Sequence, residues 1–272
     1  MAKRVIVSID GGGIRGIIPL IILKEIQQRL NLDFFTLNTS WWGTSTGALI
    51  SGAVIIQSGR RFDESIQNIL DIYEFRSATA IHPHGVSLPT RALSQLIRTN
   101  FDDYDLTAFP NLNIAVSKDE TFETVIFNAR NSCKVADAIM ASCAYPGLFP
   151  PVEINGVSYV DGYINAKNPT ELAVNTELKE NPELIVLSLG TGILRLNDQV
   201  EENVKEIHNR MQLRSENGEI DYYRFDPVLS HAVDSMQNTS PKNIINLRKD
   251  AMHCVAKNEE LIEKFIRRIE SD

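Results

Sequence analysis

Residues 5–16, Val-Ile-Val-Ser-Ile-Asp-Gly-Gly-Gly-Ile-Arg-Gly, join an apolar β-rich run to a glycine-rich turn. The apolar periodicity of residues 14–30 predicts a mostly buried helix directly after the turn. Consecutive glycines expose backbone N–H groups with no side chain in the way, and such donors at a helix N-terminus bind anions. The anion is either a phosphate or a tetrahedral oxyanion. The turn also fits the dinucleotide pattern GxGxxG, which alone is a weak signal.

A second motif, Gly-Thr-Ser-Thr-Gly at residues 43–47, follows a strand expected near 39–43 and precedes a small-residue helix expected at 45–57. This is the GxSxG pattern of a nucleophile elbow, in which a sharp strand-to-helix turn projects a serine hydroxyl into a cleft. A preceding glycine-rich loop can supply oxyanion donors, so the two motifs together favour Ser45 as a catalytic nucleophile.

The serine needs a base, and the sequence offers two kinds. A triad in the order Ser45, Asp161 and then His231 or His253 fits the chain order of α/β-hydrolases, although those enzymes place several strands before the elbow. The other candidate is Asp161 itself, which follows the apolar strand 157–160 and precedes glycine. An aspartate at a strand end is positioned to face a cleft. The five histidines are His82, His84, His208, His231 and His253.

Strand-like and helix-like segments alternate along the chain, which predicts an α/β layer fold with a mainly parallel central sheet. We expect one domain over residues 1–272, with a loop or lid-like insertion at 74–90. Asn155-Gly156 between two short apolar runs predicts a β-hairpin. Further strands are expected at 112–116, 122–126 and 184–189, a Gly-Thr-Gly turn at 190–192, and helices at 62–73, 90–99, 134–143, 169–179 and 249–269.

Composition limits the partners. The 272 residues are 43% hydrophobic and carry a formal net charge of −8, which argues against a nucleic-acid partner. The charge also argues against strong docking on an anionic membrane unless a local basic patch exists. The basic group Lys264, Arg267 and Arg268 reads as a solvated helix face. The short N-terminal apolar run and the unpaired pattern of Cys133, Cys143 and Cys254 predict a soluble, cytoplasmic protein with reduced thiols.

Taken together, three segments resemble the patatin-like phospholipase family: DGGGIRG at 10–16, GTSTG at 43–47, and the run from Asp161-Gly162 to Asn168-Pro169. Weaker echoes occur at 141–151, 187–192 and 222–227, so the resemblance spans a core of about residues 5–230. The resemblance implies a three-layer α/β/α fold and a Ser45–Asp161 dyad without histidine. It also implies an oxyanion hole from the glycine-rich loop, with donors among Gly11, Gly12, Gly13 and Ile14. The residues that support these motifs are Asp10, Arg15, Gly16, Gly43, Gly47 and Gly162.

The function implied is a lipid acyl hydrolase of phospholipase A or lysophospholipase type, acting transiently at a membrane or micelle surface without metal or cofactor. Arg15 is expected to orient the loop, with a direct phosphate contact as the alternative. Three rival functions stay open: acyl transfer by the same dyad, a catalytically idle binding protein, and nucleotide binding. Tyr163 departs from the family, which has glycine or alanine there, and we expect Tyr163→Gly to broaden tolerance of acyl chain length.

Overall fold

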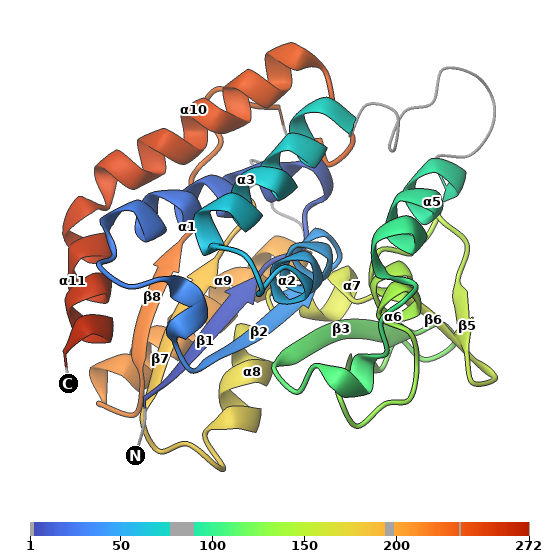
Figure 1. The fold of residues 1–272 in the computed structure, drawn as a ribbon, viewed down its shortest axis with the longest axis horizontal. Coiled ribbons are helices and arrows are strands. Elements are labelled where there is room, and N and C mark those ends of the chain that lie inside the picture. The colour runs from blue at the N-terminus through green and yellow to red at the C-terminus, as the bar shows by residue number, and fades with distance from the viewer. Residues whose placement is uncertain (1–2, 77–89, 194–198, 234, 272) are drawn as a thin grey trace.

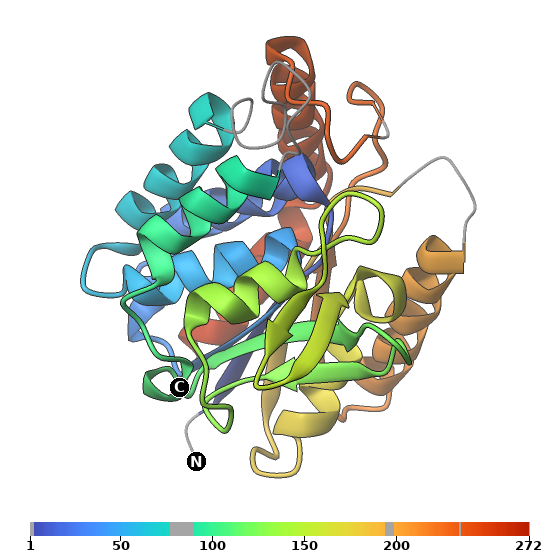
Figure 2. The same cartoon turned by 90° about the vertical axis from the view of Figure 1, so that its right-hand side faces the viewer.

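The computed structural model describes residues 3–76, 90–193, 199–233 and 235–271. Figure 1 shows a central sheet with helices on both faces, and Figure 2 shows the same layers from the side. The strands are β1 (Arg4–Ile9), β2 (Thr39–Thr44), β3 (Leu112–Lys118), β4 (Thr124–Phe127), β5 (Val152–Ile154), β6 (Val157–Asp161), β7 (Leu184–Leu189) and β8 (Asp221–Phe225). This is the three-layer α/β fold expected from the sequence.

The sheet runs in the order β5-β6-β3-β2-β1-β7-β8, with β4 also paired to β3. The neighbouring strands in the part β3-β2-β1-β7-β8 are parallel, whereas β4 and β6 run antiparallel to β3. Parallel strands end at the same edge, so the residues that follow β1 and β2 lie close together. The antiparallel β6 delivers its own carboxyl end beside Val116 of β3.

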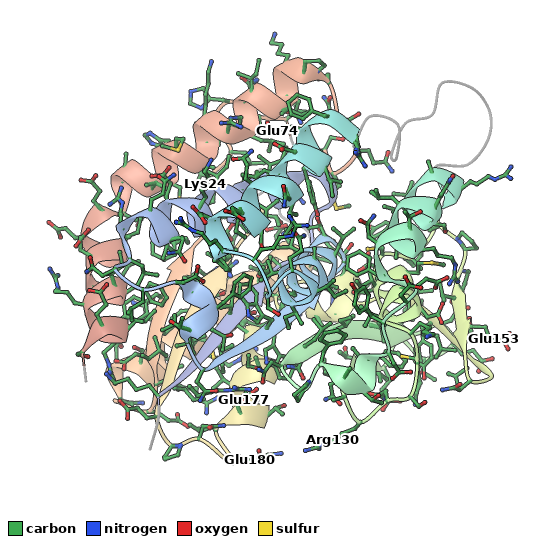
Figure 3. All side chains as sticks on the ribbon, in the orientation of Figure 1. Lys24, Glu74, Arg130, Glu153, Glu177 and Glu180 are labelled. Atoms are coloured by element: carbon green, nitrogen blue, oxygen red, sulfur yellow. The ribbon has the colours of Figure 1, made fainter. Side chains whose placement is uncertain are left out.

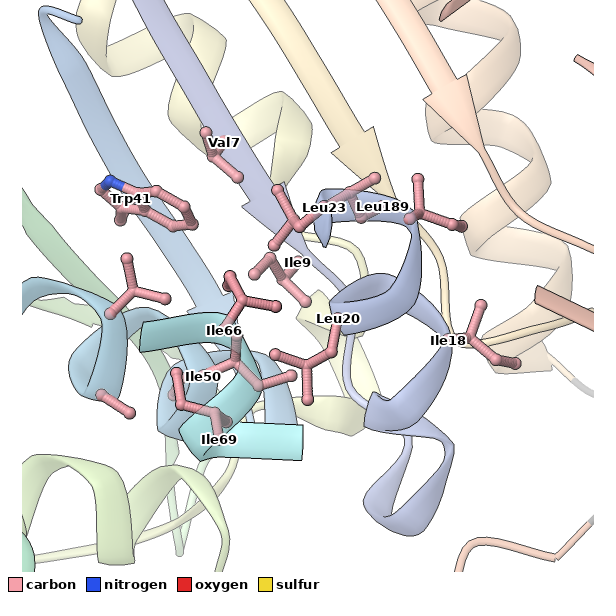
Figure 4. Close-up of a cluster of buried hydrophobic side chains, with 14 of the residues drawn as sticks. Val7, Ile9, Ile18, Leu20, Leu23, Trp41, Ile50, Ile66, Ile69 and Leu189 are labelled. Carbon is pink, nitrogen blue, oxygen red and sulfur yellow. The ribbon is translucent and has the colours of Figure 1, made fainter. Parts of the chain in front are cut away.

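The side chains of β1 pack alternately into two apolar cores, because successive side chains of a strand point to opposite faces. Val5, Val7 and Ile9 pack into the larger cluster, and Ile6 packs into the smaller one. The larger cluster lies under the helices that Figure 4 draws against the sheet. These helices and the others on the same face are α1 (Ile17–Arg29), α2 (Thr46–Ile56), α3 (Phe62–Asp71), α5 (Thr90–Phe101), α6 (Val135–Ser142) and α10 (Pro241–Lys257).

The opposite face is covered by α8 (Thr170–Glu177) and α9 (Gln199–Glu216), which contact β1, β7 and β8. The sequence analysis assigned neither α9 nor β8 nor the short α7 (Tyr163–Ala166). Helix α9 buries few side chains, so its apolar stripe is narrow. The expected helix over 169–179 is α8, and the expected hairpin is confirmed, with Asn155 and Gly156 both at positive φ.

The single helix expected over 249–269 is wrong. The structure has α10 and then α11 (Glu259–Glu270), with a break at Asn258. The backbone N–H of Asn258 donates to Cys254 O at 3.1 Å, and its side-chain amide donates to the same carbonyl at 2.8 Å. Asparagine competes in this way with backbone hydrogen bonding and ends a helix.

Two further segments differ from expectation. The helix expected over 14–30 begins as the 3₁₀ turn η1 (Gly13–Gly16) before α1. Of the loop expected at 74–90, residues 74–76 belong to the π-helical turn η3 (Ile72–Arg76), and residues 77–89 lie outside the described residues. Among the described helices, none is both long and apolar enough to cross a membrane.

Candidate active site

The turn at Ser45 is a strained strand-to-helix elbow. Ser45 has φ 56° and ψ −120° between β2 and α2, a region that costs a non-glycine residue on the order of 1–3 kcal/mol. Small neighbours make the turn sterically feasible, because a Cβ added to Gly43 would lie 2.3 Å from the Gly47 carbonyl. A Cβ on Gly47 would lie 2.1 Å from Ile9 O of β1. The glycines therefore allow the elbow to pack against its own helix and the neighbouring strand.

Ser142, at the end of α6, holds the backbone of the elbow in place. Its buried hydroxyl accepts a hydrogen bond from the Ser45 N–H at 2.8 Å and donates to Ala115 O at 2.7 Å. Ser142 lies in the segment 141–151, which resembles the family only weakly, and no local pattern assigns it a role. Only the three-dimensional structure links this residue to Ser45, 97 positions away.

Asp161 ends β6 and is 1% exposed. Burial raises the pKa of its carboxyl to about 7, although hydrogen bonds from the Ser45 hydroxyl and the Tyr163 N–H act in the opposite direction. The Tyr163 N–H donates to Asp161 Oδ1 at 2.8 Å. The sequence-predicted nucleophile and base are thus brought together, with the base poised to change its protonation state near neutral pH.

The glycine-rich loop lies against the elbow. A Cβ added to Gly11 would be 3.4 Å from Ser45 Cβ and 2.9 Å from the Tyr163 ring. The Gly11 N–H donates to Lys167 O at 2.9 Å, and the Ile14 N–H donates to Met236 O at 2.9 Å. Gly11 and Ile14 therefore do not present their N–H groups to a substrate, contrary to the expectation for these two residues.

Gly12 and Gly13 are the remaining donors of the loop. Their N–H groups form no hydrogen bond with the described part of the chain. Gly13 adopts φ +59° and also lines the pocket next to Ser45. Of the four residues expected to donate, Gly12 and Gly13 are therefore the two whose N–H groups are not engaged by the described part of the chain.

A buried polar network fixes the loop from behind. Arg15 is fully buried and donates to Gly12 O at 3.3 Å and to Gly192 O at 3.2 Å, so its guanidinium links the loop to the turn after β7. Asp10 is paired at 2.7 Å with Arg224, which also binds Asp226 at 2.7 Å. Arg224 and Asp226 belong to the weak echo at 222–227 and were not singled out from the sequence.

The pocket above Ser45 is apolar. It encloses about 870 Å³, part of which is open to solvent, and Ser45 and Asp161 both line it. Its apolar wall comes from several helices and loops, with lining residues that include Leu49, Ile72, Tyr73, Leu93, Leu96, Tyr145, Leu148, Phe149 and Met236. Tyr163 is not among the described lining residues and packs instead edge-to-face on Tyr145, with ring centroids 5.6 Å apart. Its position gives no support to the expectation that it narrows the acyl site directly.

The described histidines lie elsewhere. His231 Nδ1 is 2.6 Å from Asp250 Oδ1, and His208 Nδ1 is 3.1 Å from the Tyr222 hydroxyl. His253 lies exposed on α10. None of these three lines the pocket of Ser45, and His82 and His84 lie outside the described residues. Of the described aspartates, glutamates and histidines, Asp161 therefore is the one that lines the pocket together with Ser45.

Comparison with known proteins agrees with the resemblance. Residues 7–174 match the model of the patatin-like phospholipase family, which is more than half of the chain. A cUMP-AMP-activated phospholipase of Escherichia coli is 27% identical over 212 residues, covering 69% of this chain and 64% of that protein. An intracellular phospholipase A2 of Caenorhabditis elegans is 24% identical over 326 residues, covering all of this chain and 30% of that protein.

Solved structures give weaker similarities. VipD from Legionella pneumophila superposes with a TM-score of 0.45 at 12% identity, covering 94% of this chain and 67% of that chain. Human GIVD cytosolic phospholipase A2 superposes with a TM-score of 0.46 at 10% identity, covering 98% of this chain and 60% of that chain. The chain spans less than two thirds of the length of the two curated relatives above. From the match over residues 7–174, the chain belongs to the patatin-like phospholipase family.

Proposed function

We propose that this chain hydrolyses acyl esters of lipids, with Ser45 as the nucleophile and Asp161 as its base. One observation carries the proposal: Ser45 lines the same apolar pocket as the buried carboxyl of Asp161, whose pKa burial raises to about 7. A general base works best when its pKa is near the working pH, so burial compensates for the weak basicity of an ordinary aspartate.

In the first half-reaction, Ser45 Oγ attacks the ester carbonyl carbon while its proton passes to Asp161. The tetrahedral intermediate places negative charge on the former carbonyl oxygen, and the N–H groups of Gly12 and Gly13 are the donors proposed to stabilise it. The bond between carbon and the leaving oxygen then breaks. Asp161 gives the proton to the departing alcohol, which leaves an acyl group on Ser45.

In the second half-reaction, water attacks the acyl carbon and gives its proton to Asp161. The new tetrahedral intermediate uses the same N–H donors, and its collapse breaks the bond to Ser45 Oγ. The proton returns to Ser45 as the fatty acid leaves. Asp161 thus ends each cycle ionised, and the acyl chain lies along the apolar wall of the pocket.

The test is hydrolysis of p-nitrophenyl esters of increasing chain length, followed by defined phospholipids, with EDTA present throughout. Wild type is compared with Ser45→Ala, Asp161→Asn and His231→Ala, each checked for folding by circular dichroism. The proposal expects activity in wild type and His231→Ala and its loss in the two dyad variants. Because one relative is named as activated by cUMP-AMP, each assay is run with and without that nucleotide.

The opposite pattern would overturn the proposal. Activity that survives Asp161→Asn and falls in a histidine variant would indicate an ordinary triad. A folded wild type that hydrolyses none of these esters under either condition would favour the binding-protein alternative.

A further inference from the structure

Helix α10 presents a basic face to solvent. Its 17 residues include one acidic side chain, Asp250, which is buried and accepts hydrogen bonds from the Ala232 N–H and the Ser230 hydroxyl. The exposed side chains of α10 include four that are positively charged at neutral pH. They are Lys242, Arg248, Lys249 and Lys257.

The same face carries exposed apolar side chains. Ile245 is 54% exposed and Met252 is 45% exposed, and seven residues of helix place them on one side, two turns apart. Phe75, in the neighbouring turn η3, is 77% exposed. Large apolar side chains exposed beside basic ones are typical of helices that lie on an anionic lipid surface.

The N-terminal end of α10 lies close to the pocket of Ser45. Met236 and Gln237 line the pocket just before α10 begins at Pro241. Turn η3 contributes Ile72 to the same pocket, and its Glu74 forms an ion pair with Arg248 of α10. Figure 3 labels Glu74 where η3 approaches α10. A surface that contacts α10 and Phe75 therefore lies close to segments that line the pocket.

Charge selects the partner. The whole chain carries −8, so an anionic surface repels it unless a local basic region faces that surface. Glu74 neutralises Arg248, but Lys242 and Lys249 form no ion pair with the described residues. We propose that the exposed face of α10, together with Phe75, docks the protein on an anionic phospholipid bilayer. The inference deepens the proposed function and rests on it for its purpose, because docking there places the pocket at the lipid.

The experiment measures binding separately from hydrolysis. Ser45→Ala serves as the background so that vesicles stay intact, and sedimentation with phosphatidylglycerol vesicles is compared with phosphatidylcholine vesicles. Lys242→Glu/Lys249→Glu is compared with Lys264→Glu/Arg267→Glu on α11, which changes the net charge equally. We expect the first pair to weaken binding to anionic vesicles at least about 30-fold and the second to change it little.

Two further readings sharpen the test. Ile245→Ser/Met252→Ser should weaken the binding that remains at high salt, where electrostatic attraction is screened. Hydrolysis of a water-soluble short-chain p-nitrophenyl ester, measured with Ser45 intact, should be the same in all α10 variants. A wild type that hydrolyses no ester while the Ser45→Ala protein binds anionic vesicles would contradict the proposed function and support the docking surface.

Three outcomes would overturn the docking proposal: no preference of the Ser45→Ala protein for anionic vesicles, equal weakening by both charge-reversed pairs, or dissociation of a dimer by Lys242→Glu/Lys249→Glu with vesicle binding unchanged. The last would mean that this face joins two copies of the chain.

Discussion

The middle of the sheet and its carboxyl edge are built in opposite ways, only a few residues apart. In the middle, Val7 of β1 pairs with Trp41 of β2, and both side chains are buried in apolar packing. At the edge, Ser45 has positive φ and Asp161 holds a carboxyl buried against its preference for water. Backbone strain and desolvation are therefore concentrated at the proposed site, and the packed strands next to it stabilise these unfavourable features.

The largest expected effect comes from a substitution at the carboxyl edge, at Asp161. Asp161→Asn should lower kcat/KM by about 10⁴-fold or more, because the base is lost. The folded-state pKa of about 7 lies above the ordinary 3.8, so ionisation costs the folded protein stability as pH rises from about 4 through 7. The variant should therefore gain stability at pH 8 and gain none at pH 4, as measured by thermal unfolding.

A variant that lost both activity and stability at pH 8 would contradict this account of Asp161. Ser45→Ala is the companion variant, because it removes the nucleophile and leaves the carboxyl in place. It should lose activity without the pH-dependent gain in stability.

Gly12→Ala tests the loop at the edge. The added Cβ would lie 2.2 Å from Thr191 Oγ1, so the loop must shift and its N–H groups must move away from the position of the oxyanion. Loss of one such donor lowers kcat by roughly 10²–10³-fold. Gly59→Ala is the matched control, since nothing lies within 4 Å of its added Cβ. Equal activity of the two variants would remove Gly12 from the proposed mechanism.

Leu20→Ala tests the middle instead. Leu20 is fully buried in the larger cluster (Figure 4), and truncation of such a leucine costs about 2–5 kcal/mol of folding free energy. Urea denaturation should show this loss, while kcat per folded molecule at low temperature stays near the wild-type value. A large fall in kcat would mean that the core and the site are not separable.

Ser142→Ala removes the acceptor of the part-buried Ser45 N–H, and an unsatisfied donor costs up to about 1–3 kcal/mol. We expect kcat to fall roughly tenfold with KM unchanged, because the elbow loses its alignment and the pocket keeps its wall. Ser51→Ala is a matched control on α2, since the fully buried Ser51 hydroxyl has no hydrogen-bond partner among the described residues. If Ser142→Ala lost more stability than Ser51→Ala while the two variants had the same kcat, Ser142 would have a structural role alone.

The last prediction changes the pH and no residue. Asp161 must be ionised to accept a proton, so kcat/KM should rise through pH 7 and fall about tenfold per pH unit well below it. Stopped assays of a short-chain ester between pH 5 and 9 measure this profile. A rate that is flat down to pH 5 would show that the base has an ordinary carboxyl pKa.

The sequence predicted the parts that depend on local pattern. The apolar run of β1, the GTSTG elbow and the Asn155-Gly156 hairpin are each recognised from a few neighbouring residues, and the structure has each of them. What it could not predict depends on contacts between distant segments. The Ser142 contact to Ser45 and the engagement of Ile14 by Met236 O arise only when the chain has folded.

The prediction of a single helix over residues 249–269 failed for a different reason. The apolar spacing of residues 249–269 continues through it, so periodicity alone cannot reveal that the asparagine side chain caps α10. The basic face of α10 is not evident from the sequence, because Asp250 stands beside Arg248 and Lys249 and its burial depends on the fold. Once Asp250 is known to be buried, the surrounding lysines stand out.

The most direct test of the central claim is to find the acyl group on the enzyme. Wild-type protein is mixed with a p-nitrophenyl ester and quenched in acid at early times, and the peptides are then analysed by mass spectrometry. The account predicts an acyl adduct on the peptide that contains Ser45, absent in Ser45→Ala and not accumulating in Asp161→Asn. An adduct on Cys143, which lines the same pocket, or turnover that persists in Ser45→Ala, would contradict it.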